Sequence, residues 1–162
     1  MQSELVNSKQ IDHLTPLHYA CHRGNKQLVE LLISYGGDVT RVSKNGVTCL
    51  HLACISGSLP LVKYLINEQE IDCRIKSRAS KSQPIHVATN AGNLEIVEYL
   101  MQMHGCDPTE EDRNGENCLT LAIKNRMREV AIALIKSDRF PLAQPIENRG
   151  FNYFAYSLVK GQ

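Results

Sequence analysis

A hexapeptide that returns at an almost constant spacing is the feature that most constrains this chain. Its five versions are TPLHYA, TCLHLA, QPIHVA, NCLTLA and the more divergent NYFAYS, which begin at residues 15, 48, 83, 117 and 152. The spacings are therefore 33, 35, 34 and 35 residues. Internal similarity at such a period is typical of stacked-repeat proteins, in which each unit buries its apolar face against its neighbours. We therefore expect an array of look-alike units that share one elongated core.

Each unit carries the signals of two short helices. Pro16 suits the first turn of a helix, and Thr15 before it can cap that turn. Gly24 suits the left-handed position at which a helix ends. The helix that follows is expected to bury one apolar face, which consists of Leu28, Val29, Leu31, Leu32 and Ile33.

This hexapeptide at this period resembles the T-P-L-H-x-A template of the ankyrin repeat family, and the resemblance extends over residues 5–161. It implies an all-α ankyrin-repeat solenoid of stacked helix-turn-helix pairs with projecting hairpin loops. The expected organisation is one domain, 1–162, with repeats at about 7–39, 40–73, 74–108 and 109–141, and a partial repeat at 144–162. In the family, hairpin tips and first helices form the concave side.

Three positions depart from the template. Lys81 stands where neighbouring units have Gly46 and Gly115, in a connection that is one residue longer. Thr120 replaces the motif histidine, and Arg126 replaces the glycine of the other helix-to-helix turns. We therefore expect a remodelled turn in the third unit and a less regular fourth unit.

Both ends of the sequence interrupt a unit. This favours a piece of a longer chain. The alternative is that a last helix, expected over 153–160, is a terminal cap whose aromatic residues cover the fourth unit.

Composition excludes several classes of partner. Lys and Arg total 18 against 17 Asp and Glu, a net charge of +1, so that no global charge favours nucleic acid or an anionic membrane. The apolar runs are too short for a membrane span, and the first residues do not form the apolar h-region that is typical of a signal peptide. We expect a cytoplasmic or nuclear chain without direct membrane contact, which acts as a monomer or as part of a larger chain.

The cysteines and histidines fall on positions of the repeat framework. None of the six cysteines forms a CxxC pair, so reduced, semi-buried thiols are expected. His18, His51 and His86 are the motif histidine, which in the family bonds between neighbouring repeats. HExxH and a Gly-rich phosphate loop are missing from the sequence. We expect no cofactor, no metal site and no catalytic residues.

The resemblance also implies where a partner binds. The variable positions at hairpin tips and at the ends of first helices are Leu14, His22, Arg23, Lys44, Asn45, Val47, Ile55, Arg78, Ser80, Asn90, Arg113, Asn114, Glu116, Lys124 and Arg149. Asp12, Ser56, Ser82, Asn125 and Phe151 accompany them. Apolar groups beside cations suit a protein or peptide with aliphatic anchors and some acidic character.

The connection 74–82 is the most basic local segment. It contains four cations and three serines and lacks an acid: Arg74, Lys76, Arg78 and Lys81, with Ser77, Ser80 and Ser82. Two interpretations stay open. The segment contacts an acidic partner or is regulated by phosphorylation, or it is an ordinary solvated loop.

The function expected from these observations is a non-enzymatic protein–protein interaction module. One alternative is the cytoplasmic ankyrin segment of a membrane channel or an acyltransferase, packed against its own parent. Another is the substrate-recruiting arm of a ubiquitin ligase or a kinase, with the catalytic domain elsewhere. Nucleic-acid binding is disfavoured because the acidic run 110–112 follows the basic segment and the groove lacks stacking aromatics.

Overall fold

The structure is a computed structural model that describes residues 11–103 and 105–140. The helix expected over 153–160 and the predicted partner-binding residues Arg149 and Phe151 lie outside the described residues. Within the two described ranges the chain forms one short 3-10 helix, eight α-helices and no strand. In chain order these are η1 (Ile11–His13), α2 (Pro16–His22), α3 (Lys26–Ser34), α4 (Cys49–Ser56), α5 (Leu59–Asn67), α6 (Pro84–Asn90), α7 (Leu94–Gln102), α8 (Cys118–Lys124) and α9 (Arg128–Lys136).

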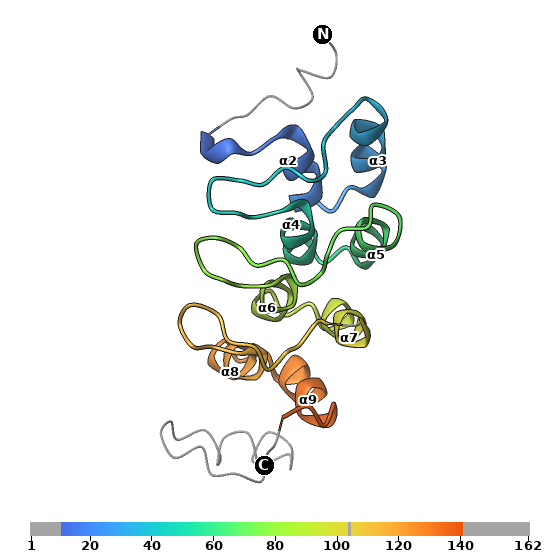
Figure 1. The fold of residues 1–162 in the computed structure, drawn as a ribbon. Coiled ribbons are helices and arrows are strands. Elements are labelled where there is room, and N and C mark those ends of the chain that lie inside the picture. Colours follow the sequence, from blue (N-terminus) through green and yellow to red (C-terminus); the bar gives the residue numbers. More distant parts are fainter. Residues whose placement is uncertain (1–10, 104, 141–162) are drawn as a thin grey trace.

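The α-helices form four pairs that lie one above another (Figure 1). The first helices of the pairs, α2, α4, α6 and α8, make one column, and α3, α5, α7 and α9 make a second (Figure 1). Successive pairs are joined by hairpin loops that project on the side of the first helices (Figure 1). Helix α2 packs on α4, α4 on α6, and α6 on α8. This confirms the all-α solenoid that the resemblance implies.

Capping residues set the ends of the helices. The Asn117 side chain accepts the N–H of Thr120 at 2.9 Å, at the start of α8. Helix α4 ends at Gly57, which has the left-handed conformation that favours glycine, with φ of 77°. Arg126, the predicted irregularity of the last pair, adopts the same conformation with φ of 58°. The helix-to-helix turn is therefore kept there at a cost in backbone strain.

One apolar core runs through the described stack. In the first helices it is built from the third residue of each hexapeptide, which is at most 9% exposed: Leu17, Leu50, Ile85 and Leu119. Burial of such a side chain stabilises the fold by about 1.5–3 kcal/mol. The shared core is therefore what holds neighbouring pairs together.

Two residues of the predicted core are exposed instead. Leu28 is 41% exposed and Leu31 is 52% exposed, so the expectation that they are buried is wrong. Leu61, Ile96 and Val130 occupy the place of Leu28 in the later pairs and are only 0, 1 and 2% exposed. They are covered by the preceding helix pair. No described helix pair precedes α3, so its outer face remains in solvent.

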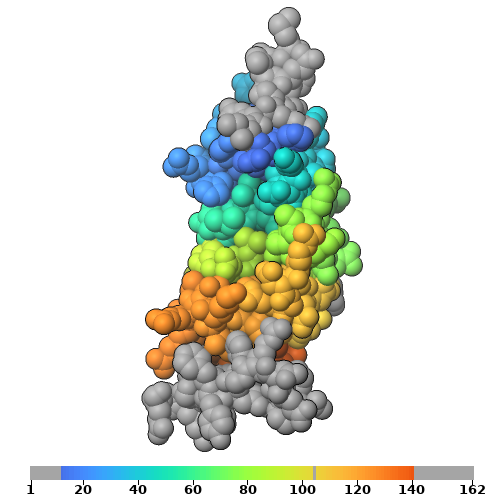
Figure 2. Space-filling view, turned by 90° about the vertical axis from the view of Figure 1, so that its left-hand side faces the viewer, coloured from blue at the N-terminus to red at the C-terminus, as the bar shows by residue number. Residues whose placement is uncertain are grey.

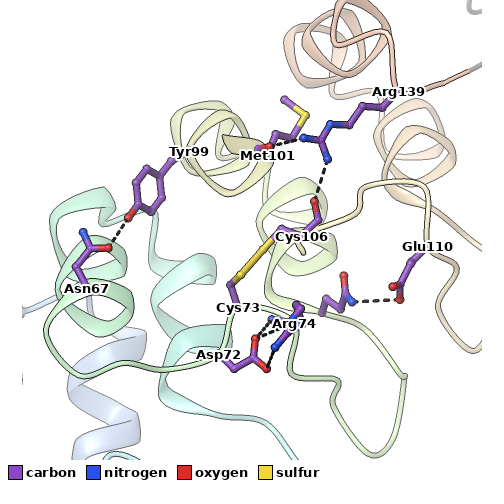
Figure 3. The surroundings of a disulfide bond; sticks show 10 residues. Asn67, Asp72, Cys73, Arg74, Tyr99, Met101, Cys106, Glu110 and Arg139 are labelled. Carbon is purple, nitrogen blue, oxygen red and sulfur yellow. Dashed lines mark hydrogen bonds and ion pairs between the residues drawn. A yellow bond between two sulfur atoms is a disulfide. The ribbon is translucent and has the colours of Figure 1, made fainter. Parts of the chain in front are cut away.

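Cys73 and Cys106 are joined by a disulfide bond (Figure 3). The expectation that all the thiols are reduced is therefore wrong for this pair. The two residues are 33 positions apart and flank the equivalent aspartates Asp72 and Asp107 after neighbouring second helices, and stacking brings their Cα atoms to 6.4 Å. The other four cysteines, Cys21, Cys49, Cys54 and Cys118, are free and buried. Burial raises the pKa of the Cys118 thiol to about 12, which keeps it protonated.

Arg126→Gly is expected to raise the free energy of unfolding by about 1 kcal/mol. A side chain in the left-handed conformation costs roughly 1–2 kcal/mol, and glycine removes that cost while making the unfolded chain more flexible. Urea denaturation measures the effect. The matched control is Gly92→Ala, at the equivalent turn, where φ is 75° and a Cβ atom would meet Met127 Sδ at 2.9 Å. This control should lower stability, and a lowered midpoint for Arg126→Gly would contradict the account.

Candidate functional site

Two buried histidines, His51 and His86, tie the first helices α4 and α6 to the hairpin that follows each in the stack. His51 Nδ1 accepts the backbone N–H of Thr48 at 3.3 Å, and His86 Nδ1 accepts that of Gln83 at 3.3 Å. In a neutral imidazole the other nitrogen then carries the proton. His51 Nε2 therefore donates to the Ser82 carbonyl at 3.0 Å, and His86 Nε2 donates to the Glu110 carbonyl at 2.8 Å.

These imidazoles are held in the neutral form. Burial lowers the pKa of His51 and of His86 below the ordinary 6.5, although the hydrogen bonds to the Ser82 and Glu110 carbonyls act in the opposite direction. The bridging geometry confirms, for His51 and His86, the expectation that the motif histidine bonds between neighbouring units. His18 Nδ1 instead bonds to Thr15 of its own unit. The rings of His51 and His86 are at most 1% exposed, so they are positioned to support the site and not to touch a ligand.

Main-chain hydrogen bonds hold successive hairpins in one register. The N–H of Lys44 donates to the Asp12 carbonyl of η1 at 2.9 Å, and those of Arg78 and Arg113 donate to carbonyls of the preceding hairpin, at 2.7 Å to Asn45 and 2.8 Å to Ser80. The three donors thus occupy the same place on successive hairpins. Their side chains are all exposed. We call Lys44, Arg78 and Arg113 the cation row.

The third hairpin is remodelled, as its extra residue predicts. The N–H of Lys81 closes the turn on the Ser77 carbonyl at 3.1 Å, and Lys81 has φ of 58°. Ser77 is 4% exposed, and its Oγ lies 2.7 Å from the Ser80 Oγ. Of the three predicted phosphorylation positions, Ser77 is therefore inaccessible without opening the hairpin, whereas Ser80 and Ser82 are partly exposed.

Half of the basic charge of this hairpin is paired within the described residues. Arg74 contacts Asp72 with 3.0 Å between Nε and Oδ1 (Figure 3). Lys76 Nζ lies 2.5 Å from Glu110 Oε2. Arg78 and Lys81 form no ion pair with any described residue. These two residues are therefore the cations of this hairpin that remain for a partner.

A hollow of about 570 Å³ lies between the hairpins and the first helices of the third and fourth pairs. We call it the groove. Figure 2 views the hairpin side of the molecule, where the pairs follow one another without a break from blue to orange. The groove is lined by Ile55 of α4, by His86, Val87, Asn90 and Ala91 around α6, by Leu121 of α8, and by the hairpin residues Ser80, Ser82, Asp112, Asn114 and Glu116.

The structure brings part of the predicted partner-binding set together. Six of its residues line the groove: Ile55, Ser80, Ser82, Asn90, Asn114 and Glu116. Lys124 borders it through an ion pair of 2.6 Å with Glu116. Lys44, Asn45, Arg78 and Arg113 lie at the hairpin tips and are exposed, and Val47 is half-buried beside them. Leu14, His22 and Arg23 belong to the first pair and lie outside the groove.

Sequence reasoning missed the apolar wall of the groove. Val87 and Leu121 line it, and both are the fifth residue of the hexapeptide. Val87 precedes Asn90 and Ala91 by one helical turn, so the three share a helix face. The signal was therefore available in the spacing. Asp112 was also missed, because its role depends on accepting the N–H of Asn114 at 2.7 Å.

A second hollow, of about 550 Å³, lies between the second helices α7 and α9. It is lined by Glu98, Met101, Gln102, Ala133, Lys136, Ser137 and Arg139. None of these residues belongs to the predicted partner-binding set. The groove is therefore the hollow that coincides with the sequence prediction.

No three His, Cys, Asp or Glu side chains in residues 11–103 and 105–140 gather in a way that could hold a metal ion. None of the helices in those ranges has the length and apolarity needed to cross a bilayer.

Comparison with known proteins identifies the class. The family model for ankyrin repeats (3 copies) matches residues 2–77 and 69–144. The chain belongs to the ankyrin repeat family. This agrees with the stacked helix pairs, the hairpins and the histidine bridges described above.

The similar proteins are diverse. The chain is 33% identical over 136 residues to palmitoyltransferase AKR1 of Lachancea kluyveri, and the aligned stretch covers 76% of this chain and 18% of that protein. It is 30% identical over 124 residues to the probable 26S proteasome regulatory subunit p28 of Saccharomyces cerevisiae, and the alignment covers 75% of this chain and 54% of that protein. It is 30% identical over 135 residues to the E3 ubiquitin-protein ligase KEG of Arabidopsis thaliana, and the alignment covers 82% of this chain and 8% of that protein. The chain thus spans less than two thirds of each of these relatives.

Stability should be level above about pH 7 and fall as the pH drops below about 6.5. Because the folded state lowers the pKa of His51 and His86, the unfolded chain binds protons there that the folded chain resists. The free energy of unfolding is therefore highest above the pKa that these histidines have in the unfolded chain. As the pH falls from there toward their pKa in the folded chain, it decreases by up to about 1.4 kcal/mol per pH unit for each histidine.

Urea denaturation between about pH 8 and pH 5 measures this dependence. The double variant His51→Gln/His86→Gln should be less stable at neutral pH and show a shallower slope. A wild-type free energy of unfolding that stays level down to about pH 5 would contradict neutral bridging histidines.

Proposed function

We propose that this chain is a non-enzymatic protein-interaction module that binds a protein or a peptide in the groove. The proposal rests on Ile55, which is 41% exposed and lies at the edge of the groove. The other residues that line the groove include amides and hydroxyls. An apolar anchor surrounded by groups that fix orientation is the usual composition of a recognition surface.

The titratable groups around the groove support binding rather than chemistry. His86 is buried and bridges to the next hairpin. Glu116 is paired with Lys124, and Asp112 accepts two backbone N–H groups of its own turn, from Asn114 and Glu116. Each of these groups is therefore used to hold the hairpins and helices in place. A nucleophile with an adjacent base would need groups that are not committed in this way.

A second candidate is that the array is one segment of a larger protein. Its support is that the chain matches 18% of a palmitoyltransferase and 8% of a ubiquitin ligase. The array would then face the cytoplasm as the recruiting or regulatory segment of an acyltransferase, a channel, a ligase or a kinase. The full-length transcript tests this candidate, through apolar spans of about 20 residues or a catalytic domain beside the array.

Ile55→Asp is expected to reduce the amount of bound partner at least about tenfold, since a charge replaces the apolar anchor of the groove. The whole chain serves as bait in a lysate of the source cells, and retained proteins are quantified by mass spectrometry. Leu31→Asp is the matched control, because it places the same charge on an exposed leucine of α3, 52% exposed and away from the groove.

The control should retain the proteins that the wild type retains. If Ile55→Asp and Leu31→Asp bind the same proteins in the same amounts, the groove is not the binding site. Thermal unfolding of both variants shows that each is folded.

A further inference from the structure

We infer that the partner presents an extended acidic segment of polyproline-II form, with a carboxylate at every third residue, to the cation row. The inference rests on the proposed function and specifies the chemistry of the segment that the hairpin side would take. It follows from the charge of Lys44, Arg78 and Arg113, from their register, and from the spacing that the hairpin stack imposes.

The cation row is exposed and forms no ion pair within the described residues. Lys44, Arg78 and Arg113 are exposed and take part in none of the ion pairs of the described chain. Arg113 Nη2 donates to the Arg78 carbonyl at 3.2 Å, which aligns this guanidinium with the row. Lys81 adds a further exposed cation on the middle hairpin. Such a surface attracts carboxylates of a partner.

The hydrogen bonds set the spacing of the row. Each hairpin is two chain segments wide, because Ser43 N–H donates to the Val47 carbonyl across the hairpin at 2.9 Å. The next hairpin is bonded directly to it, through Arg78 N–H and the Asn45 carbonyl at 2.7 Å. Hydrogen-bonded extended segments lie about 4.8 Å apart, so equivalent residues recur about every 10 Å. Packed helices, which lie about 8–10 Å apart, impose the same period.

An extended chain of polyproline-II form matches this period. It has three residues per turn and rises about 3.1 Å per residue, so every third side chain lies on one face at intervals of about 9 Å. In a β-strand, residues three apart point to opposite faces. Carboxylates at every third position of the polyproline-II form therefore meet successive members of the cation row.

Amide side chains on the hairpins and in the groove favour an extended occupant over a helical one. Asn45, Asn90 and Asn114 are exposed on the hairpins and on α6. Asn90 Oδ1 accepts from Asn125 Nδ2 at 2.7 Å, which leaves the Asn90 amino group to donate. The polyproline-II form has no internal hydrogen bonds, so its carbonyls are available to such donors. The carbonyls of an α-helix are already paired.

The local acids favour a peptide over a nucleic acid. Glu111, which is exposed, and Asp112 lie next to Arg113 at one end of the row. A polynucleotide carries a charge on every residue and would place phosphates against these carboxylates. A peptide with one carboxylate in three residues places neutral residues there. Among the described residues, the exposed large aromatics are Tyr19 and Tyr35, which belong to the first pair and not to the groove, so base stacking lacks a platform.

Fluorescence anisotropy of synthetic peptides with the whole chain tests the inference. The probe peptide consists of proline and alanine with aspartate at every third position. The reference peptide has the same composition with its aspartates adjacent. The probe should bind about tenfold more tightly than the reference, and its affinity should fall as salt is added. Equal affinities, or tighter binding of single-stranded oligothymidine than of the probe, would overturn the inference.

A matched pair of variants locates the contact. Lys44→Ser/Arg78→Ser/Arg113→Ser should weaken binding of the probe about tenfold or more. Lys63→Ser/Arg128→Ser/Lys136→Ser removes the same charge from exposed positions on second helices and should leave binding unchanged. Equal loss in both variants would overturn the inference. These outcomes are separate from the Ile55→Asp experiment, which tests the proposed function with whichever protein partner is retained.

Discussion

The rest of this structure depends on neutral imidazoles that each form two hydrogen bonds. One bond is to the start of the histidine's own helix, and the other is to the next hairpin. His51 reaches from the start of α4 to the Ser82 carbonyl, and His86 reaches from the start of α6 to the Glu110 carbonyl. Because each ring accepts at Nδ1 and donates at Nε2, it fixes two separate segments at once. The groove exists because the hairpins are held at a set distance and angle from the first helices.

Where the repeat template is broken, other groups maintain the same geometry. Thr120 has no ring to reach a following hairpin, but its Oγ donates to the Asn117 carbonyl at 2.9 Å and so keeps the start of α8 closed. Arg126 adopts the left-handed conformation of the glycine that it replaces. The extra residue of the third hairpin widens its turn without disturbing the bond from Arg113 to Ser80. A regular stack therefore tolerates irregular units as long as the contacts between neighbours remain.

Periodicity allowed the helix pairs and their ends to be predicted, because each depends on residues within one unit. The role of the motif histidines came from the family resemblance. Most of the misses concern contacts between units. The pattern marks Leu28 and Leu31 as apolar but cannot say whether a neighbour covers them. Cys73 and Cys106 become partners only when neighbouring units are placed side by side (Figure 3). The pairing of Lys76 with Glu110 likewise links two connections, and it removes charge that the sequence alone assigns to a partner.

Amide hydrogen exchange at the hairpin tips tests most directly whether the hairpins share one register. The N–H of Lys44 donates to η1, and those of Arg78 and Arg113 donate to the preceding hairpin, whereas that of Asn45 has no acceptor among the described residues. The account predicts that the three bonded amides exchange at least about tenfold more slowly than the amide of Asn45, after correction for local sequence. Exchange at the same rate as Asn45 would show that the hairpins move independently and would contradict the account.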